Sequence, residues 1–141
     1  MKKIMFICTG NTCRSPMAEG LFREMLKVRK IENIICESAG TSAYAGDEAE
    51  PNAVAAAAEL GADISAHRSR SYDPYMVDDT DLFVCMTPIH ALMLDGVPED
   101  KKTILAGGVP DPYGGDLDEY RACAKKISEG LKKLLKIAKS L

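Results

Sequence analysis

The sequence of 141 residues lacks a long hydrophobic run, and no stretch approaches the roughly 18 apolar residues that cross a membrane. Residues Met1, Lys2 and Lys3 lead directly into an apolar strand pattern, so no cleavable signal segment is expected. The net charge of −3 gives no support for a nucleic-acid or membrane surface. We therefore expect a cytoplasmic protein without nucleic-acid or membrane partners, either a monomer or a weak homo-oligomer.

The sequence also lacks an even set of cysteines and any cluster of histidines. Its five cysteines, at positions 8, 13, 36, 85 and 123, argue against a disulfide framework and favour a catalytic thiol in a reducing compartment. Only Cys8 and Cys13 are close in sequence. The two histidines and the scattered cysteines show no ligand spacing for a metal site.

Length and composition, with 46% hydrophobic and 28% charged residues, predict one globular domain over residues 1–141. Short apolar runs alternate with helical patterns. Strands are expected at 3–7, 33–38, 81–86 and 102–105, and helices at 16–28, 51–60, 88–94 and 117–141. This order predicts an α/β, three-layer doubly wound fold: a four-stranded parallel sheet, helices on both faces, and a ligand crevice at the carboxyl ends of the strands.

The segment between the first strand and the first helix carries the main functional motif. Five residues separate Cys8 from Arg14, and Ser15 and Pro16 follow, with Pro16 expected at the first helical position. Such loops bind anions, because backbone N–H groups converge there and the helix N-terminus adds positive potential. That potential and the Arg14 guanidinium favour a thiolate at Cys8, and the guanidinium can hold two oxygens of a phosphoryl group.

Other residues of this loop have expected roles of their own. Gly10 and Asn11 tolerate the left-handed backbone that a tight loop needs, and the Ser15 hydroxyl can donate a hydrogen bond to the Cys8 sulfur. Cys13 could form a reversible disulfide with Cys8 or could simply pack in the loop, and the sequence leaves both open. A structural cysteine beside a solvated arginine is the alternative for the whole motif, but the strand, loop and helix context favours a nucleophile.

Three residues outside the loop are further candidates. Asp111 begins a proline- and glycine-rich loop after the last strand. It is best placed to protonate a leaving group and then activate water, although a turn aspartate could instead cap its own backbone. Tyr44 lies on a loop without apolar neighbours, where it either walls a substrate pocket or is simply exposed. His67 is read as structural, because a thiolate that is already ionised needs no base.

Residues 8–16 resemble the phosphate loop of the low-molecular-weight protein tyrosine phosphatases, and segments 38–41 and 111–113 match further parts of that family. The resemblance covers essentially the whole chain. It implies hydrolysis of phosphorylated protein side chains through a phosphocysteine intermediate, without a metal or cofactor. The catalytic residues would be Cys8 as nucleophile, Arg14 as phosphate clamp and Asp111 as general acid.

The resemblance also implies roles for the remaining loop residues. The phosphate-binding set would be Thr9, Gly10, Asn11, Thr12, Cys13, Arg14 and Ser15, with Asn11 bracing the loop and Ser15 donating to the thiolate. Cys13 matches a loop cysteine linked in the family to redox protection. Tyr44, Thr12 and Tyr113 would form the substrate wall, Tyr44 as the aromatic that flanks a flat substrate ring.

Thr12 departs from the tyrosine-specific pattern, in which an aliphatic residue is usual at this position. Threonine there, together with the Asp-Pro-aromatic-Gly-Gly segment at 111–115, resembles the bacterial protein arginine phosphatases of the same family. A hydroxyl in place of an apolar wall offers a polar contact to a guanidinium or to attacking water. Tyr44 argues instead for a flat aromatic substrate. Phosphoarginine is therefore favoured as the substrate, and phosphotyrosine stays open.

Two other functions can be built on a cysteine loop. An arsenate reductase on the same fold would pass electrons along two further cysteines close together in sequence, and neither Cys85 nor Cys123 has such a partner. A phosphocarrier domain would hold phosphate on cysteine for a partner, and it would need neither the Arg14 clamp nor the Asp111 acid.

Overall fold

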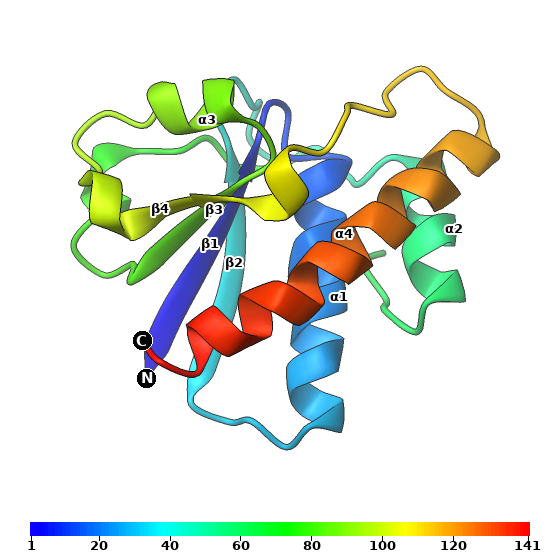
Figure 1. Cartoon of the computed structure of the whole chain (residues 1–141). Helices are drawn as coiled ribbons and strands as arrows, with labels where there is room; N and C mark the ends of the chain where they lie inside the picture. The colour runs from blue at the N-terminus through cyan, green and yellow to red at the C-terminus, as the bar shows by residue number, and fades with distance from the viewer.

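The computed structural model describes residues 1–141 and contains a four-stranded parallel sheet with strand order β2-β1-β3-β4 (Figure 1). The strands are β1 (Lys2–Cys8), β2 (Ile34–Gly40), β3 (Leu82–Cys85) and β4 (Lys102–Ile104). The helices are α1 (Arg14–Val28), α2 (Pro51–Glu59), α3 (Pro88–Leu92) and α4 (Leu117–Ala138). Short 3-10 turns are η1 (Pro74–Met76), η2 (Glu99–Lys101) and η3 (Leu105–Gly107). The predicted doubly wound α/β fold is confirmed.

The central strand β1 has apolar side chains on both of its faces. Ile4 and Phe6 belong to one buried cluster, whereas Met5 and Ile7 belong to another on the opposite face of the sheet. Successive side chains of a strand point to opposite faces, so a continuous apolar run such as residues 4–7 is covered on both sides. This burial fixes the end of β1, and with it Cys8.

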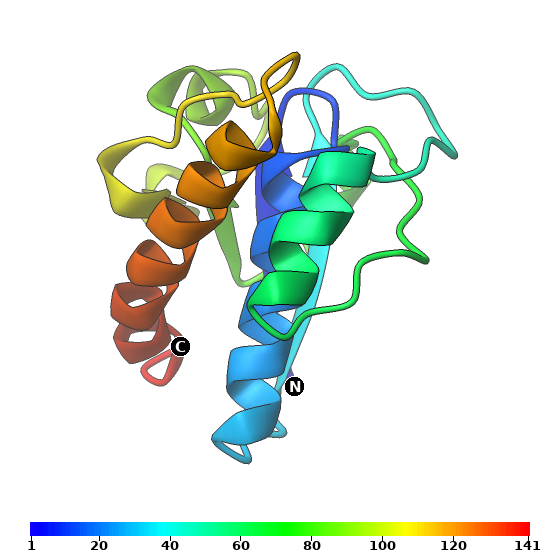
Figure 2. The ribbon, with the colours of Figure 1, turned by 90° about the vertical axis from the view of Figure 1, so that its right-hand side faces the viewer.

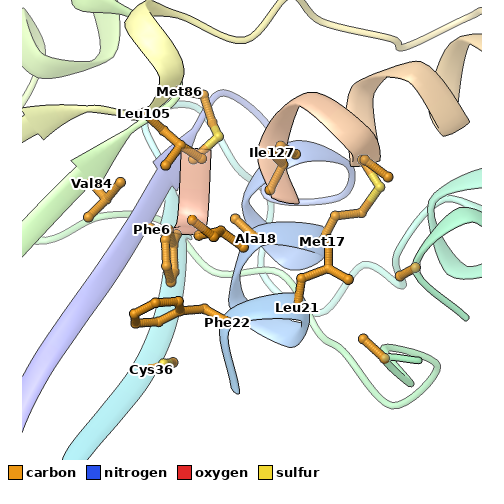
Figure 3. Packing of buried hydrophobic residues seen from close by; sticks show 14 of the residues in the cluster. Phe6, Met17, Ala18, Leu21, Phe22, Cys36, Val84, Met86, Leu105 and Ile127 are labelled. Carbon is orange, nitrogen blue, oxygen red and sulfur yellow. The ribbon is translucent and has the colours of Figure 1, made fainter. Parts of the chain in front are cut away.

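The larger core lies between one face of the sheet and helices α1 and α4, and helix α2 packs against these two helices (Figures 1 and 2). Phe22 of α1 packs edge-on against Phe6 of β1, with ring centroids 5.8 Å apart and an interplanar angle of 75° (Figure 3). Met17 of α1 and Ile127 of α4 are fully buried in the same cluster (Figure 3). The packing holds the N-terminal turn of α1, which carries Arg14, against the sheet.

The opposite face carries a smaller core of eight buried residues, including Phe83 and Leu94, beneath α3 and η1. Helices therefore lie on both faces, but unevenly. No helix in the structure combines the length and apolar character that a membrane-spanning segment requires.

Two element boundaries differ from the sequence prediction in ways that affect the loop after β1. Helix α1 begins at Arg14, two residues before Pro16, and Pro16 loses nothing there because the first four N–H groups of a helix have no partner within it. Strand β2 continues to Gly40 instead of ending at Ser38, since Ala39 and Gly40 pair with Ile7 and Cys8. The end of β2 therefore lies beside the cysteine loop.

Candidate active site

Two loops meet at the carboxyl edge of the sheet. Cys8 is the last residue of β1, and Arg14 is the first residue of α1. The loop between them and the loop that begins near Asp111 line one cavity of about 210 Å³; its lining residues are Cys8, Thr9, Gly10, Thr12, Cys13, Arg14, Asp111 and Tyr113. Seven of the sequence candidates for catalysis or phosphate binding thus share a cavity, and the eighth lining residue, Tyr113, was expected as a wall.

Asn11 is the structural centre of the loop although it does not line the cavity. It is fully buried and adopts a left-handed backbone with φ of 56°. Its side-chain nitrogen donates to Ser15 Oγ at 2.7 Å and to Ser38 Oγ at 3.0 Å, and its Oδ1 accepts from the backbone N–H of Arg70 at 3.0 Å. Because Asn and Gly tolerate this conformation best, the expectation for Asn11 is confirmed.

The matching expectation for Gly10 is wrong, because Gly10 is not among the residues with positive φ. A single left-handed residue, Asn11, is enough to turn the loop. Its carbonyl oxygen accepts a hydrogen bond from His67 Nε2 at 2.7 Å, so His67 has the structural role that the sequence indicated.

The Cys8 sulfur lies 2.9 Å from Ser15 Oγ. Ser15 Oγ already accepts a hydrogen bond from the amide of Asn11, so its own hydrogen is free to point at the sulfur. A hydroxyl that donates to sulfur stabilises the thiolate form. Asn11 therefore orients Ser15 so that its hydroxyl hydrogen can point at the Cys8 sulfur.

Gly40 lets strand β2 approach the loop at backbone contact distance. A Cβ at residue 40 would overlap the Thr9 carbonyl oxygen and would lie 3.1 Å from the backbone nitrogen of Asn11. Two backbone hydrogen bonds join the same segments, from Thr41 N to Cys8 O at 2.9 Å and from Ser42 N to Thr9 O at 3.0 Å. The loop is thus attached to the sheet on this side.

Arg14 is buried, and its guanidinium is held at the wall of the cavity by three oxygen atoms. Nη1 donates to the Val109 carbonyl at 3.0 Å, and Nη2 donates to Thr9 Oγ1 at 3.4 Å. The same Nη2 lies 3.6 Å from Asp111 Oδ2. The fork therefore has a fixed orientation between the cysteine loop and the Asp111 loop.

Asp111 makes the turn contact that the sequence offered as one alternative, and it also faces the cavity. Its Oδ1 accepts from the backbone N–H of Tyr113 at 3.1 Å, as in an ordinary turn, whereas Oδ2 faces Arg14. Its side chain is 50% exposed and lines the cavity, so the carboxyl group is open to water as well.

The two tyrosines expected in the substrate wall lie differently. Tyr113 lines the cavity and is largely exposed. Tyr44 is 81% exposed and is absent from the cavity lining. Tyr113 is therefore the one aromatic side chain that lines the cavity.

Sequence reasoning missed two side chains that contact the loop from distant elements. Tyr120 of α4 lies with its hydroxyl 3.3 Å from the Cys13 sulfur, and His90 of α3 lies with Nε2 2.8 Å from Thr9 Oγ1. Burial raises the pKa of the Cys13 thiol, against the effect of its hydrogen bonds to Tyr120 and Thr12. No local pattern marks either contact, because both join residues far apart in sequence.

Comparison with known protein families identifies one family that matches nearly the full length of the chain. The family model described as low molecular weight phosphotyrosine protein phosphatase matches residues 3–141. The chain belongs to this family. A protein-arginine-phosphatase of Bacillus subtilis is 36% identical to this phosphatase over 143 residues, covering 94% of each chain. A probable low molecular weight protein-tyrosine-phosphatase, EpsP, of Ralstonia nicotianae is 40% identical over 138 residues, covering 93% of this chain and 92% of the relative.

Solved structures show the same likeness. The YwlE arginine phosphatase, in a mutant with a phosphorylated active-site serine, superposes on this phosphatase with a TM-score of 0.90 at 35% identity, covering 97% of this chain and 95% of the other. A low molecular weight protein tyrosine phosphatase from T. tengcongensis gives 0.89 at 36% identity, covering 96% and 99%. The chain is thus a protein phosphatase by family, with relatives named for both phosphoamino acids.

The arsenate reductase alternative is not favoured. All five cysteines of the phosphatase are free, and burial raises the pKa values of Cys36, Cys85 and Cys123 to about 12. A thiol with so high a pKa is a poor nucleophile at neutral pH. The reductase needs two reactive thiols beyond the loop, and these three cysteines do not supply them.

Proposed function

We propose that this phosphatase hydrolyses phosphoarginine in proteins in preference to phosphotyrosine, through a phosphocysteine intermediate. The observation that carries the preference is the polar lining of the cavity: Thr12 and Asp111, with a hydroxyl and a carboxyl side chain, line it, and Tyr113 is its one aromatic residue. A guanidinium offers several N–H donors that need acceptors, whereas a phenyl ring needs flat apolar surfaces. The relatives named protein-arginine-phosphatase, at 36% and 34% identity, support this choice.

In the first step the Cys8 thiolate attacks phosphorus, so that the sulfur–phosphorus bond forms as the phosphorus–nitrogen bond of phosphoarginine breaks. The Arg14 fork and the loop N–H groups hold the phosphoryl oxygens and stabilise their charge in the transition state. Asp111 gives its proton to the departing guanidine nitrogen. The products of this step are an unphosphorylated arginine residue in the substrate protein and phosphocysteine on the enzyme.

In the second step Asp111, now a carboxylate, takes a proton from water while the water oxygen attacks phosphorus. The sulfur–phosphorus bond breaks, the Cys8 thiolate is restored and inorganic phosphate leaves. Ser15, 2.9 Å from the sulfur, stabilises the thiolate as it departs. We place this reaction in the cytoplasm, where the thiol stays reduced, and expect a monomer or a weak homo-oligomer.

Substitution of Thr12 tests the substrate preference. We expect the wild-type enzyme to have a higher kcat/KM for phosphoarginine than for phosphotyrosine peptides, and Thr12→Ile to move this ratio roughly tenfold toward phosphotyrosine, because an apolar wall replaces a polar contact. The measurement is side-by-side kinetics of both enzymes on both peptides. Thr103→Ile on strand β4, remote from the cavity, serves as the matched control. An unchanged ratio in Thr12→Ile would remove the basis for the phosphoarginine assignment.

Substitution of Asp111 tests the acid and base steps. With p-nitrophenyl phosphate, whose leaving group needs little protonation, Asp111→Ala should slow the second step by roughly 100-fold and let phosphocysteine accumulate. Rapid quenching should trap this phosphoenzyme, together with a burst of nitrophenol. The control is Asp116→Ala, because Asp116 Oδ1 accepts from Glu119 N at 2.9 Å and caps α4 without lining the cavity. A slow Asp111→Ala enzyme without phosphoenzyme would contradict the second role of Asp111.

A further inference from the structure

His90 belongs to helix α3 and contacts the loop between Cys8 and Arg14. It is 4% exposed. Its Nε2 lies 2.8 Å from Thr9 Oγ1, and its Nδ1 lies 3.1 Å from Thr87 Oγ1. Thr87 is the N-cap of α3, and its Oγ1 also accepts from the backbone N–H of His90 at 3.4 Å. The imidazole thus spans two threonine hydroxyls, one of which lines the catalytic cavity.

The charge state of His90 limits which hydrogen bonds it can make. Burial lowers its pKa to about 4, the Arg14 guanidinium acts in the same direction, and the Asp111 carboxylate opposes both. At neutral pH the ring is therefore neutral, with one N–H donor and one acceptor nitrogen.

One arrangement satisfies the buried ring and leaves a hydrogen for the substrate. Thr87 Oγ1 already accepts from a backbone N–H, so its hydroxyl hydrogen can be donated to Nδ1. Nε2 then carries the ring hydrogen and donates it to Thr9 Oγ1. Thr9 Oγ1 also accepts from Arg14 Nη2 at 3.4 Å, so both of its lone pairs are used. The hydroxyl hydrogen of Thr9 is left free to point into the cavity that Thr9 lines.

We propose that His90 is a positioning residue that makes Thr9 a hydrogen-bond donor to the phosphoryl group. This inference deepens the proposed function and rests on it. His90 Nε2–H occupies one lone pair of Thr9 Oγ1 and Arg14 occupies the other, so the Thr9 hydroxyl donates to a phosphoryl oxygen and at the same time orients the guanidinium. The phosphate loop thereby gains a side-chain donor that depends on a residue 81 positions away in the sequence.

A pair of amide substitutions at residue 90 provides the test. The side-chain nitrogen of glutamine can take the place of Nε2 and donate to Thr9, whereas that of asparagine reaches only the place of Nδ1. We expect His90→Asn to lower kcat/KM for p-nitrophenyl phosphate roughly tenfold and to weaken the binding of inorganic phosphate by a similar factor, the loss expected for one hydrogen bond to a charged group. His90→Gln should stay within about threefold of wild type in both measurements.

A double substitution shows whether His90 acts through Thr9. Thr9→Val keeps the shape of residue 9 and removes its hydroxyl, and it should weaken phosphate binding roughly tenfold by itself. Added to Thr9→Val, His90→Asn should cause no further loss, because the donor that it positions is already gone. Losses that multiply to roughly 100-fold would overturn the proposal.

Thermal unfolding of each variant separates positioning from a merely structural role. Equal losses of phosphate binding in His90→Gln and His90→Asn would overturn the proposal, and so would a lower melting temperature in His90→Asn with unchanged phosphate binding. Calorimetric titration with inorganic phosphate does not require turnover. A wild-type enzyme that binds phosphate with the expected His90 pattern but fails to hydrolyse phosphoarginine would therefore contradict the proposed function and leave the role of His90 supported.

Discussion

Replacing Cys8 by serine should abolish hydrolysis of p-nitrophenyl phosphate, with a loss in kcat of at least about 1000-fold, equivalent to about 4 kcal/mol in the activation barrier. A serine hydroxyl in this position has no base to ionise it: Ser15 Oγ, 2.9 Å from the sulfur, can donate a hydrogen but does not remove one at neutral pH. The loop itself is attached to the sheet through Gly40 and Asn11, so the anion site should persist. Calorimetric titration should show that Cys8→Ser still binds inorganic phosphate.

Cys36→Ser is the matched control for this substitution. Cys36 is a buried cysteine of strand β2, outside the cavity lining, and burial raises the pKa of its thiol to about 12. The control should therefore keep nearly wild-type kcat. A Cys8→Ser enzyme with near-full activity would contradict the phosphocysteine intermediate and with it the proposed mechanism.

Replacing Arg14 by lysine should lower kcat/KM roughly 100-fold although the charge is kept. The buried guanidinium is oriented by the Val109 carbonyl, 3.0 Å from Nη1, and by Thr9 Oγ1, 3.4 Å from Nη2. A lysine ammonium cannot present two parallel donors to the phosphoryl oxygens. Steady-state kinetics should show the loss mainly in kcat, because the fork is best matched to the transition state.

Arg121→Lys is the control for Arg14→Lys, since Arg121 pairs with Glu59 and Asp118 on the exposed side of α4, away from the cavity. This control should change kcat/KM by less than about twofold. An Arg14→Lys enzyme that keeps wild-type kcat would show that charge alone is required at this position. It would contradict bidentate binding of the phosphoryl oxygens by Arg14.

Much of the fold could be predicted because the signals are local. The apolar run at residues 4–7 and the alternation of strands with helical patterns were enough for the parallel doubly wound sheet. The errors of the sequence prediction lie where tertiary contacts determine the backbone conformation. Strand β2 runs on to Gly40 because β1 pairs with it there, and Gly10 needs no left-handed backbone because Asn11 alone makes the turn.

The site was accessible from sequence only where its residues are neighbours in the chain or follow strands. Cys8 and Arg14 belong to one motif, and Asp111 follows a strand of the same sheet, so topology brings it to the same edge. The contacts of His90 and Tyr120 with the loop join residues 81 and 107 positions apart in the sequence. Local patterns in a single sequence do not reveal contacts between residues so far apart along the chain. The position of Tyr44 outside the cavity lining likewise depends on the path of a loop.

The close approach of Gly40 to Thr9 and Asn11 has a consequence for ligand affinity. Since the strand end and the loop are packed backbone to backbone, the course of the loop is set when the sheet folds, before any phosphorylated protein arrives. Little conformational entropy then has to be spent on ordering the loop at each encounter, and a small dianion can be captured by a few contacts alone.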